Sequence, residues 1–251
     1  MSKLQIAVLF GGVSSEHEVS RMSATTVLNA IDKSLYDVTP VGIKKDGSWW
    51  WYPGEVSLIA DGGWEACPDN LPAFLAPDAS IGGLLIRGSD HRDTIKKIDC
   101  VIPALHGKNG EDGTVQGLLQ LAGIPFVGCD MASSSACMDK VITNVMLEQA
   151  GIPQAGFTWL YAYEFQKSPR EAIDRIEKAM GRYPVFVKPA SAGSSVGVSK
   201  AENRHDLEAA IAKSAKEDGK ILIEENIVGQ EVECAVLGNE DDLLASTVGE
   251  I

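Results

Sequence analysis

The chain has 251 residues, of which 45% are apolar and 23% charged, and its formal net charge is −13 at pH 7. This composition predicts a globular protein with two domains, and a third only if that one is incomplete. The acidic balance argues against nucleic acid and membrane surfaces as partners, although it leaves room for a local basic pocket. No apolar run approaches the ~18 residues of a membrane span. The five scattered cysteines form no CxxC pair, which favours reduced thiols and a cytoplasmic location over a disulfide framework or a zinc site.

The first elements predict an α/β unit with a doubly wound parallel sheet. Residues 6–10 and 36–43 read as strands, separated by a glycine turn at 11–15 and a helix at 16–31. Strand, glycine turn, helix and strand is the usual opening of such a sheet. Ser15 is the expected N-cap of the helix. Its expected buried face is made of apolar residues at helical spacing: Val19, Met22, Val27 and Ile31.

Residues 44–94 show little periodicity and predict a long excursion with short strands. Its aromatic cluster, Trp49 to Tyr52, has two interpretations, a hairpin packed on the domain surface or a stack for a base, and we favour the hairpin. A strand then follows at 100–105, with a helix at 114–122 and a short strand at 125–127. Ligands of open α/β sheets bind outside the carboxyl ends of strands. The Gly11 turn and the loop from His106 to Gly113 both lie at such ends, so we expect them to face one crevice.

The later segments predict a second unit of α+β order. Helices are expected at 139–150, 169–180 and 206–216, and strands at 156–161, 185–187 and 221–224. Segments 231–237 and 243–248 read as an antiparallel pair turned at Gly238 and Asn239. We expect domain boundaries that give units of residues 1–128, 129–224 and 225–251.

The segment after residue 187 carries the most informative pattern of the chain. A buried strand delivers Lys188 to a loop of small residues that runs from Ser191 to Gly197. The backbone N–H groups of such a loop can converge on an anion, since glycine tolerates unusual backbone angles. The order differs from the Walker pattern, in which the lysine follows the glycines. Lysine and loop together indicate a flexible cover over nucleotide phosphates.

Other polar residues are open to a structural and a functional interpretation. Glu16 and Glu18 either stabilise a helix start or bind a ligand ammonium, and the helical step allows only one of them to point inward. His106 either binds a carboxylate or moves a proton, or it is a turn histidine bonded to backbone. Lys140 and Lys188 are the basic candidates on an acidic background. Three acids, Glu224, Glu225 and Glu231, either accept hydrogen bonds from an adenine amino group and ribose hydroxyls or are solvated.

The order of these patterns closely resembles that of D-alanine–D-alanine ligases. The resemblance rests on residues 9–20 (LFGGVSSEHEVS), 104–117 (ALHGKNGEDGTVQG), 138–140 (MDK), 187–197 (VKPASAGSSVG) and 222–225 (LIEE). It runs from about residue 4 to the end, and the segment after Lys44 resembles the subgroup with an extended N-terminal domain. The resemblance implies an α/β N-terminal domain, an ATP-grasp α+β central domain and an incomplete C-terminal ATP-grasp domain.

The resemblance also implies the chemistry. ATP phosphorylates one D-alanine, a second D-alanine attacks the acyl phosphate, and the dipeptide enters peptidoglycan synthesis. Glu16, Val19 and His106 would bind the first D-alanine, and Ser194 would couple the glycine loop to Glu16. The implied ATP contacts are Lys140, Lys188, Ser194, Ser195, Val196, Glu224, Glu225, Ile227 and Glu231. The cofactors would be ATP with Mg²⁺ or Mn²⁺, and the protein would be a cytoplasmic homodimer.

The resemblance implies that the family continues beyond Ile251, where the metal ligands and a transition-state arginine are expected. No metal ligand is therefore assigned within this sequence, and the chain itself is expected to be impaired or inactive. Two alternatives stay open. One is a ligase that joins D-alanine to D-serine or D-lactate, and the other is a non-catalytic fragment that only binds ligand.

Overall fold

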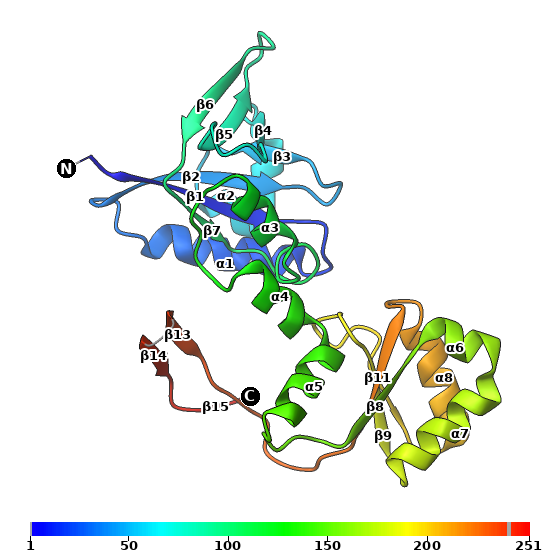
Figure 1. Ribbon diagram of the computed structural model, residues 1–251. Helices are drawn as coiled ribbons and strands as arrows, with labels where there is room; N and C mark the ends of the chain where they lie inside the picture. Colours follow the sequence, from blue (N-terminus) through cyan, green and yellow to red (C-terminus); the bar gives the residue numbers. More distant parts are fainter. Residues whose placement is uncertain (1, 240–241) are drawn as a thin grey trace.

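The computed structural model describes residues 2–239 and 242–251 and begins with a seven-stranded mixed sheet (Figure 1). Its parallel part has the order β2 (Tyr36–Ile43), β1 (Leu4–Gly11) and β7 (Cys100–Pro103). Strand β1 is central there, with Leu9 opposite Val41 on one side and Pro103 on the other. The predicted parallel sheet is thus confirmed for these adjacent strands, and their carboxyl ends lie along one edge.

The excursion after residue 43 extends the same sheet with antiparallel strands. These are β3 (Trp49–Trp51), β4 (Leu71–Leu75), β5 (Gly83–Arg87) and β6 (Asp93–Lys97). Helix α2 (Ser57–Asp61) and a 3-10 turn at Gly63–Ala66 lie between β3 and β4. The tryptophan cluster packs against the core, which agrees with the favoured structural interpretation. It does so as a strand of the large sheet and not as a hairpin on the domain surface. Trp49 and Trp51 contact the core on one face, and Trp50 contacts the core on the other.

Helix α1 (His17–Ala30) corrects two details of the sequence prediction. Its N-cap is Glu16 and not Ser15. The expected apolar face is confirmed for Val27 and Ile31, which pack against the core, and is wrong for Val19 and Met22, which are 50% and 58% exposed. The buried face consists of smaller or polar residues: His17, Ser20, Ala24 and Leu28. Apolar periodicity misses this face because two of its members, His17 and Ser20, are polar residues that are buried with backbone hydrogen-bond partners, described below.

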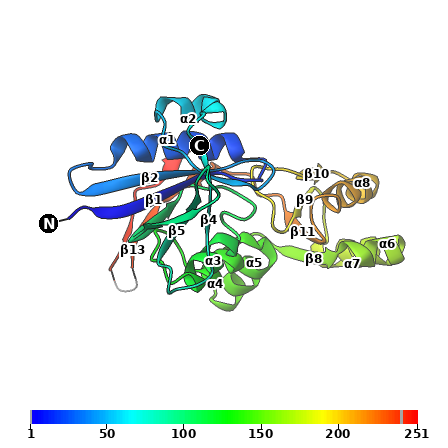
Figure 2. The same ribbon diagram turned by 90° about the horizontal axis from the view of Figure 1, so that it is seen from above.

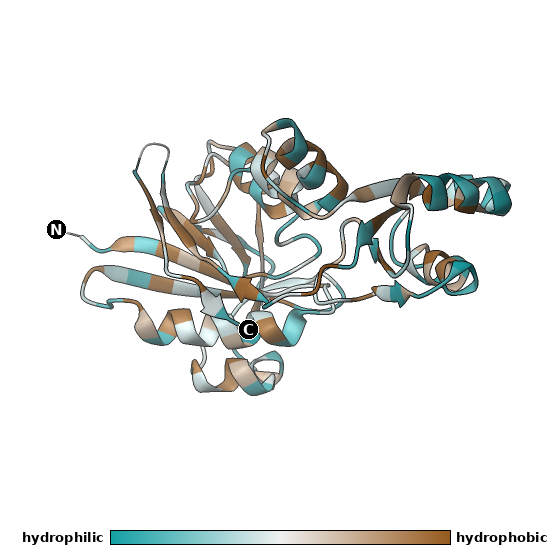
Figure 3. Cartoon of the chain, turned by 90° about the horizontal axis from the view of Figure 1, so that it is seen from below, coloured by the Kyte–Doolittle hydropathy of each residue, from teal (hydrophilic) through white to brown (hydrophobic). Residues whose placement is uncertain are grey.

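Helices cover both faces of the large sheet (Figure 2). Helices α1 and α2 lie on one side, over a core that includes Phe10 and Trp64. Helix α3 (Thr114–Leu121) lies on the other side, over a core that includes Leu9 and Leu119. Figure 3 shows hydrophobic residues concentrated on the strands between these layers. Residues 125–127 form only a single parallel bridge, from Phe126 to Val101.

The second unit is a four-stranded antiparallel sheet with helices on both faces (Figure 1). Its order is β10 (Ser199–Ala201), β9 (Val185–Pro189), β11 (Lys220–Glu225) and β8 (Phe157–Tyr161). Helices α6 (Ala162–Lys167), α7 (Pro169–Met180) and α8 (Arg204–Ser214) bury one face. Helix α5 (Lys140–Gln149) packs on the other through Val141 and Leu222. Helices α4 (Met131–Met138) and α6 and strand β10 were not predicted.

The C-terminal segment forms two small antiparallel pairs. Strand β12 (Val232–Glu233) pairs with β15 (Gly249–Glu250), and β13 (Val236–Asn239) pairs with β14 (Asp242–Ala245). The predicted antiparallel pairing is confirmed between residues 236–239 and 242–245, but the predicted turn position is wrong, because Gly238 and Asn239 are paired strand residues. The described residues of these strands are exposed. Within the described ranges, none of the helices has the length and apolar character needed to cross a membrane.

Candidate active site

The Gly11 turn and the His106 loop meet at the carboxyl ends of β1 and β7, as predicted. Together they line a pocket of about 210 Å³ that also receives Leu105 and Val115. The hydroxyl of Ser20 joins them, since it accepts from the Gly11 N–H at 2.8 Å and donates to the Ala104 carbonyl at 2.5 Å. His17 is 1% exposed and its Nδ1 lies 2.7 Å from the Gly12 carbonyl. Helix α1 therefore fixes both loops from beneath.

Glu16 is the acid that lies between the His106 loop and the glycine loop of the second unit. Its Oε1 accepts a hydrogen bond from the hydroxyl of Ser194, which belongs to the glycine loop of the second unit. A Cβ added to Gly107 would lie 2.4 Å from Glu16 Oε2, and one added to Gly193 would lie 3.1 Å away. These glycines thus allow two loops to close around one carboxylate. Glu18 points away and pairs with Lys45 at 2.6 Å. Glu16 is therefore the acid that can bind a ligand ammonium.

His106 is held by polar partners on both ring nitrogens. Nε2 lies 2.8 Å from the Ser23 hydroxyl, and Nδ1 lies 3.5 Å from Glu111 Oε1. Glu111 is fixed in turn, since its Oε2 accepts from the Gly107 N–H at 2.8 Å. A histidine oriented in this way can bind a carboxylate or exchange a proton. Val19, the third residue expected here, lies 50% exposed on the first turns of α1.

The glycine loop contains two serines in a backbone conformation that favours glycine. Ser194 has φ of 47° and Ser195 has φ of 57°. Non-glycine residues held at positive φ cost energy and concentrate at functional sites. Val196 continues the loop, with its N–H donating to the Gly193 carbonyl at 3.0 Å. The turn aims the Ser194 hydroxyl at Glu16 and so joins the two halves of the site.

Lys140 lies at the start of α5, beneath the glycine loop. Its Nζ donates to the carbonyl of Ala192 at 2.7 Å, and its N–H donates to that of Ala190 at 3.0 Å. Burial, together with the positive charge of Lys188, lowers the pKa of the Lys140 ammonium. An ammonium that is partly desolvated and close to a second cation is well placed for a polyanion. Asp139 caps the same helix and pairs with Lys220 of β11.

Lys188 and Glu224 form an ion pair on neighbouring strands, with Nζ 2.5 Å from Oε2. The side chain of Glu224 is 15% exposed and that of Lys188 is 30% exposed. The other oxygen of Glu224 accepts from the amide of Asn144 at 2.8 Å. Lys140, Lys188 and Glu224 therefore lie on one face of the small sheet, which is the face that carries α5.

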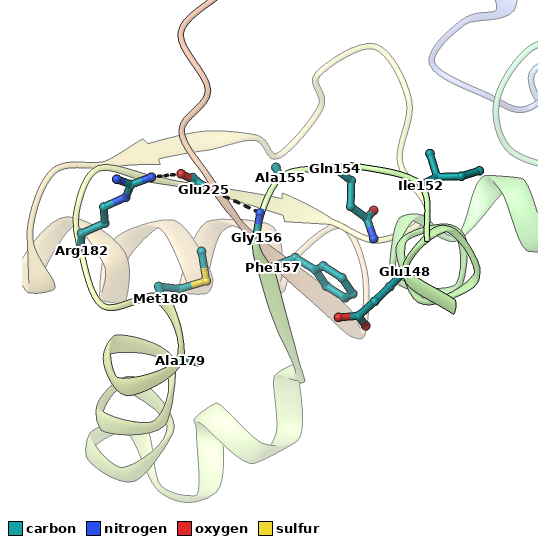
Figure 4. A pocket seen from close by; sticks show the side chains of 10 residues that line it. All are labelled: Glu148, Ile152, Gln154, Ala155, Gly156, Phe157, Ala179, Met180, Arg182 and Glu225. Carbon is teal, nitrogen blue, oxygen red and sulfur yellow. Dashed lines mark hydrogen bonds and ion pairs between the residues drawn. The ribbon is translucent and has the colours of Figure 1, made fainter. Parts of the chain in front are cut away.

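Three of the expected ATP contacts lie elsewhere. Glu225 faces the opposite side of β11, where it pairs with Arg182 and accepts from the Gly156 N–H at 3.2 Å. Figure 4 shows this pair at a pocket of about 580 Å³, lined also by Phe157 and Met180. Ile227, 64% exposed, and Glu231 follow β11 in an exposed segment. The structure therefore does not bring these three residues to Lys188.

The described residues provide no cluster of three or more His, Cys, Asp or Glu side chains that could hold a metal ion. Glu224, the acid nearest the lysines, is already engaged by Lys188 and Asn144. The ligand set of a divalent ion is thus not found among the described residues.

Sequence reasoning did not predict four contacts that position the site residues. They involve Ser20, Ser23, Asn144 and the Asp139–Lys220 pair. Ser20 and Ser23 lie four and seven residues after Glu16, a spacing that places them on the same helix face as Glu16. That spacing was a usable signal. Asn144 and Lys220 gave none, because their partners lie about 80 residues away in the sequence.

Family models of the D-ala D-ala ligase N-terminus and C-terminus match residues 5–129 and 146–251. D-alanine–D-alanine ligase of Acetivibrio thermocellus is 47% identical over 99% of this chain and 68% of its own length. The vancomycin B-type resistance protein VanB of Enterococcus faecalis is 43% identical over 100% of this chain and 68% of its own length. The crystal structure of VanG D-Ala:D-Ser ligase from Enterococcus faecalis gives a TM-score of 0.89 at 40% identity, over 99% of this chain and 70% of that one.

Fold and site therefore define an enzyme of the ATP-grasp class. The matches to both family models and to relatives above 40% identity give the narrower assignment. The chain belongs to the D-alanine–D-alanine ligase family.

Proposed function

We propose that this chain joins two D-alanines in an ATP-dependent reaction that supplies a peptidoglycan precursor. The γ-phosphoryl group of ATP moves to a carboxylate oxygen of the first D-alanine and gives ADP and D-alanyl phosphate. The amine of the second D-alanine then attacks the acyl carbon. The carbon–nitrogen bond forms, the carbon–oxygen bond to phosphate breaks, and phosphate and a proton leave.

In this proposal the crevice holds the first D-alanine and the small sheet holds the nucleotide. Glu16 binds the substrate ammonium, with Val19 beside the methyl group and His106 near the carboxylate. Lys140, Lys188 and the loop at Ser195 and Val196 bind the phosphates, and Glu224 accepts from the adenine amino group. Reactions of this kind are accelerated chiefly by positioning and charge neutralisation, which these residues supply.

The observation that carries the proposal is the hydrogen bond from Ser194 to Glu16. It joins the phosphate-binding loop of one unit to the amino-acid crevice of the other, so that both reactants would meet at one point. Glu225, Ile227 and Glu231 are also proposed to reach the nucleotide, although they lie apart from Lys188 here. Mg²⁺ or Mn²⁺ would accompany ATP and assist transfer by neutralising phosphate charge.

The test is the steady-state release of ADP with D-alanine and ATP varied separately. Glu16→Gln removes the charge opposite the ammonium and should lower kcat/KM for D-alanine by about ten- to a hundredfold, the effect of one charged hydrogen bond. Lys188→Ala should instead raise KM for ATP. Glu18→Gln, which changes an exposed acid two residues away, is the matched control and should match the unmodified chain. Unchanged D-alanine kinetics in Glu16→Gln would reduce Glu16 to a helix-start acid.

A competing proposal is that the second substrate is D-serine or D-lactate instead of D-alanine, and the similarity to the VanG D-Ala:D-Ser ligase favours D-serine. Supplying D-serine and D-lactate beside D-alanine, with mass detection of each product, decides between them. Nucleotide binding without ADP release would favour the non-catalytic alternative.

We infer domain boundaries after residues 128 and 224. The separate hydrophobic cores of the large and small sheets support the first, and the exposed segment that follows β11 supports the second to within a residue. We also propose that the protein is a homodimer, on the resemblance to the family, and that it acts in the cytoplasm, which the free cysteines support. Light scattering on the purified chain tests the dimer.

A further inference from the structure

Helix α5 presents a second polar side chain to the nucleotide face, one turn after Lys140. Asn144 lies four residues later, so it projects from the same face of the helix. Its Nδ2 donates to Glu224 Oε1 at 2.8 Å, across 80 residues of sequence. The amide therefore contacts the one acid on this face that the proposed function assigns to the adenine base.

The carboxylate of Glu224 is held from two sides by donors of different kinds. Lys188, a cation, lies 2.5 Å from Oε2, and Asn144, a neutral donor, occupies Oε1. In the proposed function Lys188 binds the phosphates of ATP, which draws its ammonium away from Glu224. Asn144 would then be the remaining protein donor to the carboxylate. Its neutrality matters, because it orients the acid without competing for the phosphates.

Asn144 is itself well anchored. Its backbone carbonyl accepts from Gln154 Nε2 at 2.6 Å. The first turn of α5 is fixed to β11 by the Asp139–Lys220 pair and by the packing of Val141 on Leu222. The amide thus sits at a defined point above β11, which is what a positioning residue needs.

We propose that Asn144 is a positioning residue that holds Glu224 for a purine amino group and thereby sets nucleotide selectivity. A carboxylate accepts hydrogen bonds and donates none when ionised. A purine with an amino group at position 6 satisfies it, whereas a 6-oxo purine presents a second acceptor and leaves both groups unpaired. This inference rests on the proposed contact between Glu224 and adenine.

The test compares three nucleotides on the chain itself: ATP, GTP and purine riboside triphosphate, which lacks the amino group. Dissociation constants are measured by ligand-detected NMR, which reaches millimolar affinities. Asn144→Ala should weaken ATP binding by about three- to tenfold, the effect of one lost hydrogen bond. Binding of purine riboside triphosphate should stay within about twofold, since that ligand makes no use of the orientation of Glu224. The preference for ATP over GTP should fall by the same factor as ATP affinity.

Two further variants make the result decisive. Asn144→Asp keeps the shape but replaces the donor with an acceptor, and it should weaken ATP at least as much as Asn144→Ala. Gln149→Ala, an exposed change on the same helix, is the control and should match the unmodified chain. Circular dichroism checks that each variant folds. If Asn144→Ala does not fold, an NMR titration of the unmodified chain replaces it, and the side-chain amide resonance of Asn144 must then shift when ATP is added.

The outcomes separate this inference from the proposed function. Equal losses for ATP and purine riboside triphosphate, or no loss for either, would overturn the role of Asn144. If the unmodified chain binds ATP and purine riboside triphosphate equally, the contact between Glu224 and adenine is what fails. If it binds no nucleotide, the proposed function and this inference are both refuted.

Discussion

Removing the hydroxyl of Ser20 is expected to destabilise the first unit strongly, although the change deletes a single atom. Ser20 is fully buried, and its Oγ serves both the Gly11 N–H and the Ala104 carbonyl. In Ser20→Ala both backbone groups would lose this partner inside the protein. Each unsatisfied buried group costs about 1–3 kcal/mol, so a loss of about 2–6 kcal/mol in the free energy of unfolding is expected for the two groups together.

Urea denaturation followed by tryptophan emission measures this loss, because Trp49, Trp50, Trp51 and Trp64 all pack against the cores of the large sheet. The matched control is Thr39→Val. Thr39 is 1% exposed, and its hydroxyl has no hydrogen-bond partner in the described part of the chain. Replacing that hydroxyl with a methyl group should leave stability unchanged or raise it by up to about 1 kcal/mol. A Ser20→Ala loss below about 0.5 kcal/mol, the range of ordinary surface changes, would refute the argument.

Two other predictions follow from exposure and burial. Amide hydrogen exchange should be slow in β1, where residues 6–11 are buried, and fast in β14, which is exposed and pairs only with β13 among the described strands. Equal protection of the two strands would contradict this. Burial, followed by a hydrogen bond to Glu177 at 2.9 Å, raises the pKa of Tyr183 to about 12. The folded state holds this proton more tightly than the unfolded state does. The contribution of Tyr183 to the free energy of unfolding is therefore fully present below a pH of about 10 and is lost as the pH rises towards 12. The measurement is a pH titration of phenolate absorbance in the unmodified chain and in Tyr183→Phe. The difference between the two curves should have its midpoint near pH 12, and a midpoint near 10 would contradict the burial argument.

Local sequence signals predicted the parallel strands, the glycine loops and the inward position of one acid near the helix start. Each depends on residues close together in the chain, such as Gly11 and Glu16. The spacing of Ser20 after Glu16 indicated the helix face, but the burial of Ser20 could not be predicted, since its partner Ala104 lies 84 residues away. The same holds for Glu224, whose partner Asn144 lies on another element. Glu224 and Glu225 are adjacent in sequence, but strand alternation sends them to opposite faces of β11.

The two serines at positive φ have a consequence for variation among natural and laboratory variants. At Ser195, glycine, asparagine and aspartate fit the left-handed backbone, whereas valine, isoleucine and threonine are strained by their branched Cβ. A mutational scan would therefore find this position intolerant even if its hydroxyl had no chemical task. Ser194 would look equally intolerant, but there the hydroxyl contact to Glu16 adds a second constraint. Glycine substitutions tell the two apart: glycine should be accepted at position 195 and rejected at position 194.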